Sequence, residues 1–151
     1  MTENDIPPCM IYIDKEGKWF HEGSEMIHRE IIRHFYRHME IDSSGLYIIS
    51  WRGERCYVEV EDTPFIVRRA VSEKDDQIGF TRVVLYLSDD EKEDLSPETL
   101  HVGKDNVIYC MVKNGTFPAR FTRAAYYQLA ECIEEEGGMY YLTLKGKRYF
   151  I

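Results

Sequence analysis

The chain has 151 residues, a formal net charge of −8 and 44% hydrophobic residues. At this length such an apolar content can form a core, which excludes a wholly disordered chain. An acidic protein repels phosphate backbones, so we expect no nucleic-acid partner. The sequence has no apolar stretch of the roughly 20 residues that a membrane span requires. Its N-terminus has neither the basic start nor the apolar segment of an export signal. We therefore expect a globular, cytoplasmic protein without a membrane partner.

The four cysteines agree with a reducing compartment. Cys9, Cys56, Cys110 and Cys132 are widely spaced, and no CxxC pair suggests zinc or redox chemistry. A chain without an export signal gives little reason to expect disulfides. We interpret Cys56 and Cys132 as small core residues.

The first part of the chain predicts strands on either side of one helix. Residues 11–20 are typical of two strands joined by a polar turn. In residues 27–39 apolar side chains recur at spacings of three and four, which indicates an amphipathic helix. Residues 45–58 then predict a β-hairpin whose tight turn contains Arg52 and Gly53.

The middle of the chain predicts two further strands, residues 64–71 and 78–87. Residues 88–97 follow with five acidic residues and one lysine. Such a run is typical of a solvated loop. We interpret it as the connector between two halves of the protein.

The last part repeats the first in the same order, at an offset of 93 residues for the final hairpin, 94 for the helix and 89 for the first pair of strands. Residues 100–109 predict strand, turn and strand, and residues 121–133 predict a helix with Thr122 as its N-cap and Gly137-Gly138 at its end. Residues 138–151 align with residues 45–58, and the turn glycines Gly53 and Gly146 coincide.

This internal repeat predicts an α+β protein of two similar strand-strand-helix-strand-strand halves, packed together and mainly antiparallel. We place the N-terminal half at residues 8–71, the central strand and acidic connector at 72–95, and the C-terminal half at 96–151. A half of this size is marginally stable alone, so we expect the halves to share a core and unfold together.

Several motifs resemble one bacterial family. They are residues 18–23 (KWFHEG), Arg29, residues 58–65 (VEVEDTPF) and residues 119–129 (ARFTRAAYYQL). With these motifs the chain resembles the domain-of-unknown-function family 1285 (DUF1285) from about Met10 to its C-terminus. The resemblance implies a compact two-part α+β protein with repeated structural motifs, no established enzyme activity and a suggested role in signal transduction.

His21 and Glu22 form the first candidate site. A histidine near a carboxylate at the end of a strand can support acid–base chemistry. Neighbouring strand residues face opposite ways, however, and no nucleophile or metal motif accompanies the pair. We weigh a catalytic, a ligand-contacting and a structural role for these residues, and we assign no catalytic residue.

The predicted first helix carries His34 and His38, whose spacing of four suits two metal ligands. Arg33 and Arg37 lie between and beside them and disfavour a cation. We therefore interpret these histidines as part of a solvated helix face and expect neither a metal nor a cofactor.

Arg29 and Arg123 occupy equivalent positions at the starts of the two predicted helices. An arginine in a first turn opposes the helix dipole, so a carboxylate or a bound anion should compensate it. Glu59, Asp62 or Glu22 can clamp Arg29 to the sheet. A structural clamp and an anion site therefore both stay open.

Together these features favour a non-catalytic regulatory or binding module. It would take a small anionic ligand or a protein partner between the halves, through His21, Glu22, Arg29, Glu59, Asp62 and Arg123. Two alternatives remain: a hydrolase-like enzyme using His21 and Glu22, and an assembly protein that forms a homodimer through its sheet edges.

Overall fold

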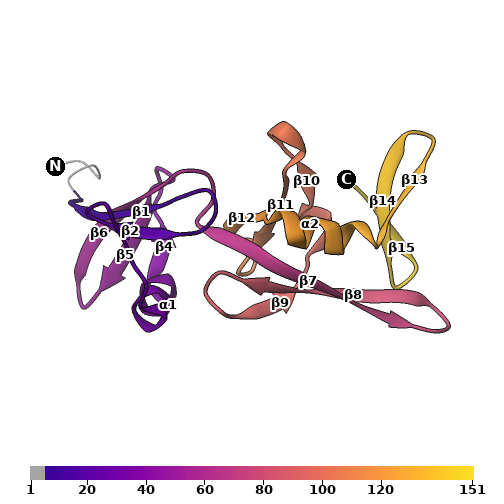
Figure 1. Ribbon diagram of the computed structural model, residues 1–151, viewed down its shortest axis with the longest axis horizontal. Coiled ribbons are helices and arrows are strands. Elements are labelled where there is room, and N and C mark those ends of the chain that lie inside the picture. Colours follow the sequence, from indigo (N-terminus) through magenta and orange to yellow (C-terminus); the bar gives the residue numbers. More distant parts are fainter. Residues whose placement is uncertain (1–5) are drawn as a thin grey trace. The chain divides into compact units, whose positions relative to one another are not determined.

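A computed structural model describes residues 6–151, which divide into two compact units. The N-terminal unit ends at Pro64 and the C-terminal unit runs from Phe65 to Ile151. Both contain a six-stranded, mainly antiparallel sheet and one α-helix (Figure 1). The predicted α+β class with two similar halves is confirmed. The division lies at Pro64–Phe65, so the strand predicted at residues 64–71 belongs almost entirely to the C-terminal unit.

Residues 6–64 of the N-terminal unit form seven elements. They are β1 (Pro8–Ile13), β2 (Trp19–His21), β3 (Ser24–Glu25), α1 (Arg29–Arg37), β4 (Met39–Ile41), β5 (Tyr47–Trp51) and β6 (Glu54–Val60). Its sheet has the order β3-β2-β1-β6-β5-β4. Two antiparallel meanders meet at its centre, where β1 and β6 pair in parallel.

The buried face of this sheet is fixed to α1 through aromatic side chains. Trp19 of β2 is 1% exposed, and its ring contacts Phe35 and Tyr36 of α1. The Trp19 indole N–H donates to the Tyr36 hydroxyl at 3.1 Å, and that hydroxyl donates to the carbonyl of Pro64 at 2.8 Å. The polar ends of these two large side chains are therefore satisfied inside the core.

The predicted hairpin turns are present in both units. Arg52 and Gly53, between β5 and β6, both have positive φ, at 52° and 81°. Lys145 and Gly146 repeat this geometry at 51° and 79°. Two successive positive φ values characterise the type I′ turn that matches strand twist, and glycine adopts this conformation without steric cost.

The C-terminal unit begins with six strands that form its main sheet. They are β7 (Phe65–Asp75), β8 (Gly79–Leu87), β9 (Lys92–Asp94), β10 (His101–Val102), β11 (Ile108–Val112) and β12 (Phe117–Phe121). Short 3₁₀ helices, η2 (Pro97–Thr99) and η3 (Lys104–Asn106), flank β10. The unit ends with α2 (Arg123–Ala130) and a separate sheet of β13 (Ile133–Glu136), β14 (Met139–Leu144) and β15 (Lys147–Phe150).

Helix α2 lies against β7 and starts as predicted. The Thr122 hydroxyl accepts a hydrogen bond from the Ala125 amide at 3.1 Å, which makes Thr122 the N-cap. The Gln128 side chain accepts from the Ala70 amide of β7 at 2.7 Å. Buried Ala125 and Leu129 complete the helix face that packs on the sheet.

The two main sheets share one plan, which differs from the repeat seen in the sequence. In both, the first and last of six strands pair in parallel at the centre, β1 with β6 and β7 with β12. The sequence repeat instead aligns the β5–β6 hairpin with the β14–β15 hairpin. The hairpin β14–β15 lies in the separate three-stranded sheet, so these segments are alike locally but occupy different places in the fold.

Two local predictions in the second half are wrong. The second helix ends at Ala130, because Ile133 already begins β13, and Gly137-Gly138 is the turn between β13 and β14. The acidic run is also more than a solvated loop. It contains β9, which pairs with β8, and buried Asp89, whose carboxylate lies 2.6 Å from the ammonium of Lys113. This lysine neutralises a charge that is costly to bury alone.

Candidate functional site

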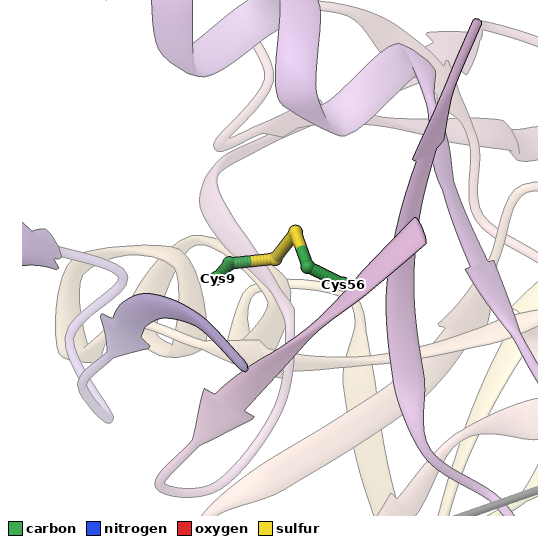
Figure 2. The surroundings of a disulfide bond; sticks show 2 residues. All are labelled: Cys9 and Cys56. Carbon is green, nitrogen blue, oxygen red and sulfur yellow. A yellow bond between two sulfur atoms is a disulfide. The ribbon is translucent and has the colours of Figure 1, made fainter. Parts of the chain in front are cut away.

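A disulfide joins Cys9 of β1 to Cys56 of β6, which lie in neighbouring parallel strands (Figure 2). The Cα atoms are 4.9 Å apart, although 47 positions separate the residues in sequence. The interpretation of Cys56 as a free core residue is therefore wrong, because the fold brings a distant partner beside it. Cys110 and Cys132 are buried free thiols, and for Cys132 the interpretation as a core residue is confirmed.

A pocket of about 510 Å³ lies next to this disulfide in the N-terminal unit. We call it the disulfide pocket. Its wall consists of the disulfide, apolar side chains from the sheet and the helix, and three polar residues. The lining residues are Cys9, Ile11, His21, Glu25, Met26, Ile27, His28, Ile31, Phe35, Ile49 and Cys56. The volume falls in the range of small-molecule sites, about 300–1,000 Å³.

The helix side of the disulfide pocket comes from a stripe of apolar residues spaced four apart, Ile27, Ile31 and Phe35. Ile31 and Phe35 lie on one face of α1, and Ile27 precedes the N-cap residue His28. The sequence predicts that this face is buried, but the side chains of Ile27 and Ile31 are 74% and 46% exposed. They form an open apolar wall, which is the kind of surface that an apolar group would cover.

The polar groups of the disulfide pocket are His21, Glu25 and His28. His21 pairs with Ile11 in the β1–β2 ladder, and strand alternation places it on the same sheet face as Trp19. His28 precedes α1, and its side chain does not cap the helix. An imidazole can donate to an anionic or hydroxyl group, whereas the Glu25 carboxylate accepts from a donor and opposes an anion.

Glu22 does not accompany His21 in the disulfide pocket. With Glu59 it lines a second pocket of about 440 Å³, the acidic pocket, which also includes Tyr12 and Phe20. These two aromatic residues belong to the sheet face opposite His21, because strand residues alternate. Burial and a hydrogen bond to a neighbouring carboxylate raise the pKa of Tyr12. The structure thus brings Glu22 and Glu59 together, and their two negative charges disfavour an anion there.

Arg29 is the first residue of α1 and is partly buried. Asp62 follows β6 and is also partly buried. Burial raises the pKa of Tyr47, and the negative charge of Asp62 raises it further. Neither Arg29 nor Asp62 lines the disulfide pocket or the acidic pocket. The clamp between Arg29 and a carboxylate stays a prediction.

Arg123 is the first residue of α2 and lines a pocket of about 330 Å³ in the C-terminal unit, the arginine pocket. Arg120, Tyr126 and Tyr127 contribute to the same wall, together with one acidic residue, Asp105. Two guanidinium groups and one carboxylate leave an excess of positive charge. This arrangement can receive an anion between arginine donors and the start of a helix.

His34 and His38 contact each other and the indole of Trp51, with ring centroids 4.7, 4.5 and 4.4 Å apart. They are half-buried rather than fully solvated. Within residues 6–151 no group of three or more His, Cys, Asp or Glu residues has an arrangement that could hold a metal ion. In the same range no helix is long and apolar enough to cross a membrane.

Comparison with known proteins connects this architecture to solved structures. A crystal structure of a DUF1285 family protein from Silicibacter pomeroyi matches with a TM-score of 0.79 and 16% identity over 97% of this chain and 81% of that chain. The chain has the DUF1285 fold. A DUF1285 protein from Shewanella baltica matches with a TM-score of 0.64 and 17% identity over 81% of this chain and 91% of that chain. The resemblance indicated by the sequence motifs is therefore confirmed at the level of the fold.

No protein-family model matches the sequence. No curated protein matches it either.

The sequence interpretation found His21 but missed most of the disulfide pocket. The amphipathic pattern of residues 27–39 predicts a buried helix face that includes Ile31, and the spacing of Ile31 with Phe35 is the signal that could have identified an apolar wall. The disulfide has no comparable sequence signal, because the pairing of β1 with β6 is a property of the whole sheet.

Proposed function

We propose that this protein is a binding module whose N-terminal unit takes a small amphipathic acid in the disulfide pocket. One observation carries the proposal. An open apolar wall and the two imidazoles of His21 and His28 line the same cavity of about 510 Å³. The apolar body of the ligand would cover Ile27 and Ile31, and its carboxylate would accept hydrogen bonds from the imidazoles.

Glu25 allows a test of whether the pocket binds the carboxylate of the ligand. Its carboxylate lines the same pocket and opposes a ligand carboxylate, but it has no such effect on an alcohol of the same shape. The ligands 3-phenylpropionate and 3-phenylpropanol form a suitable pair for titration by isothermal calorimetry.

We expect His21→Ala to weaken binding of the acid by about tenfold, which corresponds to one lost hydrogen bond to a charged group. We expect Glu25→Gln to strengthen binding of the acid and to leave binding of the alcohol unchanged. His101→Ala is the matched control, because His101 is an exposed histidine that does not line the pocket. If His101→Ala and His21→Ala have equal effects, or if neither ligand binds, the proposal is wrong.

A second candidate is a small anion in the arginine pocket, favoured by Arg120 and Arg123 in one wall. Pyrophosphate should then raise the melting temperature of the protein. The effect should disappear in Arg123→Gln and persist in Arg52→Gln, which changes an exposed arginine of the β5–β6 turn. If both variants keep the effect, pyrophosphate binds elsewhere.

A role in signal transduction and the binding of a protein partner or a second copy stay predictions. So does the hydrolase-like alternative, for which His21 and Glu22 do not converge on one pocket. The cytoplasmic location also stays a prediction, and it loses the support that four unpaired cysteines would have given.

A further inference from the structure

The disulfide has a chemical environment that its structural role does not require. Both Cys9 and Cys56 are partly exposed, and both line the disulfide pocket. A reagent that enters the pocket therefore reaches a sulfur–sulfur bond. Most of the surrounding wall is apolar, including Ile11, Ile31 and Phe35. This wall favours a reagent with an apolar substituent.

The backbone on the Cys9 side is irregular. The register of β1 against β6 shifts between Pro8 and Tyr12, and Met10 within this bulge has a φ of 64°. A non-glycine residue with such a positive φ is in a sterically disfavoured conformation. Cys9 therefore lies in the stretch of β1 that has no regular register partner in β6.

The other two cysteines do not compete for thiol reagents. Cys110 is 0% and Cys132 is 2% exposed, and both belong to the C-terminal unit. Burial raises the pKa of the Cys110 thiol to about 12. Because the thiolate is the reactive form, exchange in the folded protein is confined to Cys9 and Cys56.

From these observations we infer that the disulfide pocket is a thiol–disulfide exchange site for small apolar thiols. The thiolate of the reagent attacks one sulfur of the pair and forms a mixed disulfide with it. The sulfur–sulfur bond breaks, and its electron pair goes to the other cysteine, which leaves as a thiolate and takes a proton from water. A second thiol can then release the first as a symmetrical disulfide, so that two reagent thiols are oxidised and the cysteine pair is reduced.

The apolar substituent of the bound thiol would lie against Ile31 and its neighbours, and His21 and His28 line the cavity in which the leaving thiolate forms. The inference rests on the proposed function in one respect, because both require that the pocket accept an apolar group.

The test compares benzyl mercaptan with 2-mercaptoethanol, two thiols of similar acidity and different polarity. Oxidised protein is treated with each thiol and quenched with acid, and mixed disulfides are measured by intact mass and peptide mapping. After correction for the thiolate fraction, benzyl mercaptan should react at least about tenfold faster, as expected for burial of a ring. In concentrated urea this preference should disappear, because the pocket no longer exists.

Ile31→Gln and Ile78→Gln are the matched variants. Both replace an exposed isoleucine, at 46% and 58% exposure, but only Ile31 lines the pocket. Ile31→Gln should reduce the preference for benzyl mercaptan several-fold, whereas Ile78→Gln should keep it. Equal rates for the two thiols in the native protein, an unchanged preference in Ile31→Gln, or unpaired Cys9 and Cys56 in protein purified without reductant would each overturn the inference.

These results are separable from those of the proposed function. Binding of 3-phenylpropionate together with unselective exchange overturns only the exchange site. Selective exchange without binding of 3-phenylpropionate supports the exchange site and overturns the proposed function.

Discussion

Removal of the Cys9–Cys56 disulfide should strongly destabilise the N-terminal unit. The double variant Cys9→Ser/Cys56→Ser opens a covalent loop whose ends are 47 positions apart. In the chain-entropy relation, a loop of this length restricts the unfolded chain by an amount worth about 4 kcal/mol. A unit of this size has a small core and a small free energy of unfolding. We therefore expect the variant to lose most of the free energy of unfolding of this unit.

Tryptophan fluorescence can follow this loss selectively. The chain has two tryptophans, Trp19 and Trp51, and both lie in the N-terminal unit. Urea unfolding monitored by fluorescence therefore reports on this unit, whereas far-ultraviolet circular dichroism reports on both. If the two units unfold together, as the sequence analysis predicts, the two probes should give one midpoint in the oxidised protein. Separate midpoints would show that the units unfold independently.

Dithiothreitol provides the control within the same protein. It should shift the fluorescence midpoint of the wild type toward that of the double variant and should not affect the double variant, whose remaining cysteines are buried thiols. The reasoning is refuted if oxidised wild type and double variant differ by less than about 0.5 kcal/mol, which is the range of ordinary surface substitutions.

Three further predictions concern single residues. Tyr36→Phe removes a buried hydroxyl that bonds the Trp19 indole and a backbone carbonyl, so urea unfolding should show a loss of about 2 kcal/mol; an unchanged midpoint would contradict this. Because burial raises the pKa of Cys110 to about 12, iodoacetamide at pH 8 should leave it unmodified in the native protein and alkylate it in urea. The hydrogen bond from the Ser44 hydroxyl, with others from the same turn, lowers the pKa of Asp42 below 3.8. A lowered pKa stabilises the fold above the unfolded value, so Asp42→Asn should reduce stability at pH 7, and its difference from wild type should vanish as the pH falls through the native pKa.

The sequence predicts those features that are encoded over short distances. The turn at Arg52-Gly53 and the cap at Thr122 each depend on the conformational preference of one or two residues, and both are present. The division into β7 and β8 is likewise marked by runs of β formers on either side of a polar turn. Local signals of this kind identify elements without determining their partners.

Local sequence signals do not determine which strands pair in a sheet. The hairpins β5–β6 and β14–β15 have similar residues and the same turn, yet only β6 also pairs with a parallel partner, β1. The parallel pairs β1–β6 and β7–β12 each join strands separated by most of their unit. These parallel pairs form according to which hydrophobic faces the whole unit buries. The local sequence repeat therefore aligned the β5–β6 hairpin with the β14–β15 hairpin, which occupies a different place in its unit. The acidic run shows the same effect, because the burial of Asp89 depends on Lys113, far along the chain.

The candidate site combines both kinds of information. The sequence analysis separates His21 from Glu22 by strand alternation. The structure does place them in two different pockets, but Glu22 lies in the turn between β2 and β3, with a φ of 49°. The wall that gives the disulfide pocket its chemistry requires the parallel contact of β1 with β6, since only that contact brings Cys9 to Cys56. A sequence with the same hairpins but a different central pairing would keep His21 at the end of its strand and lose the disulfide beside it. The ligand preference proposed for this pocket therefore depends on sheet topology as much as on the residues that line it.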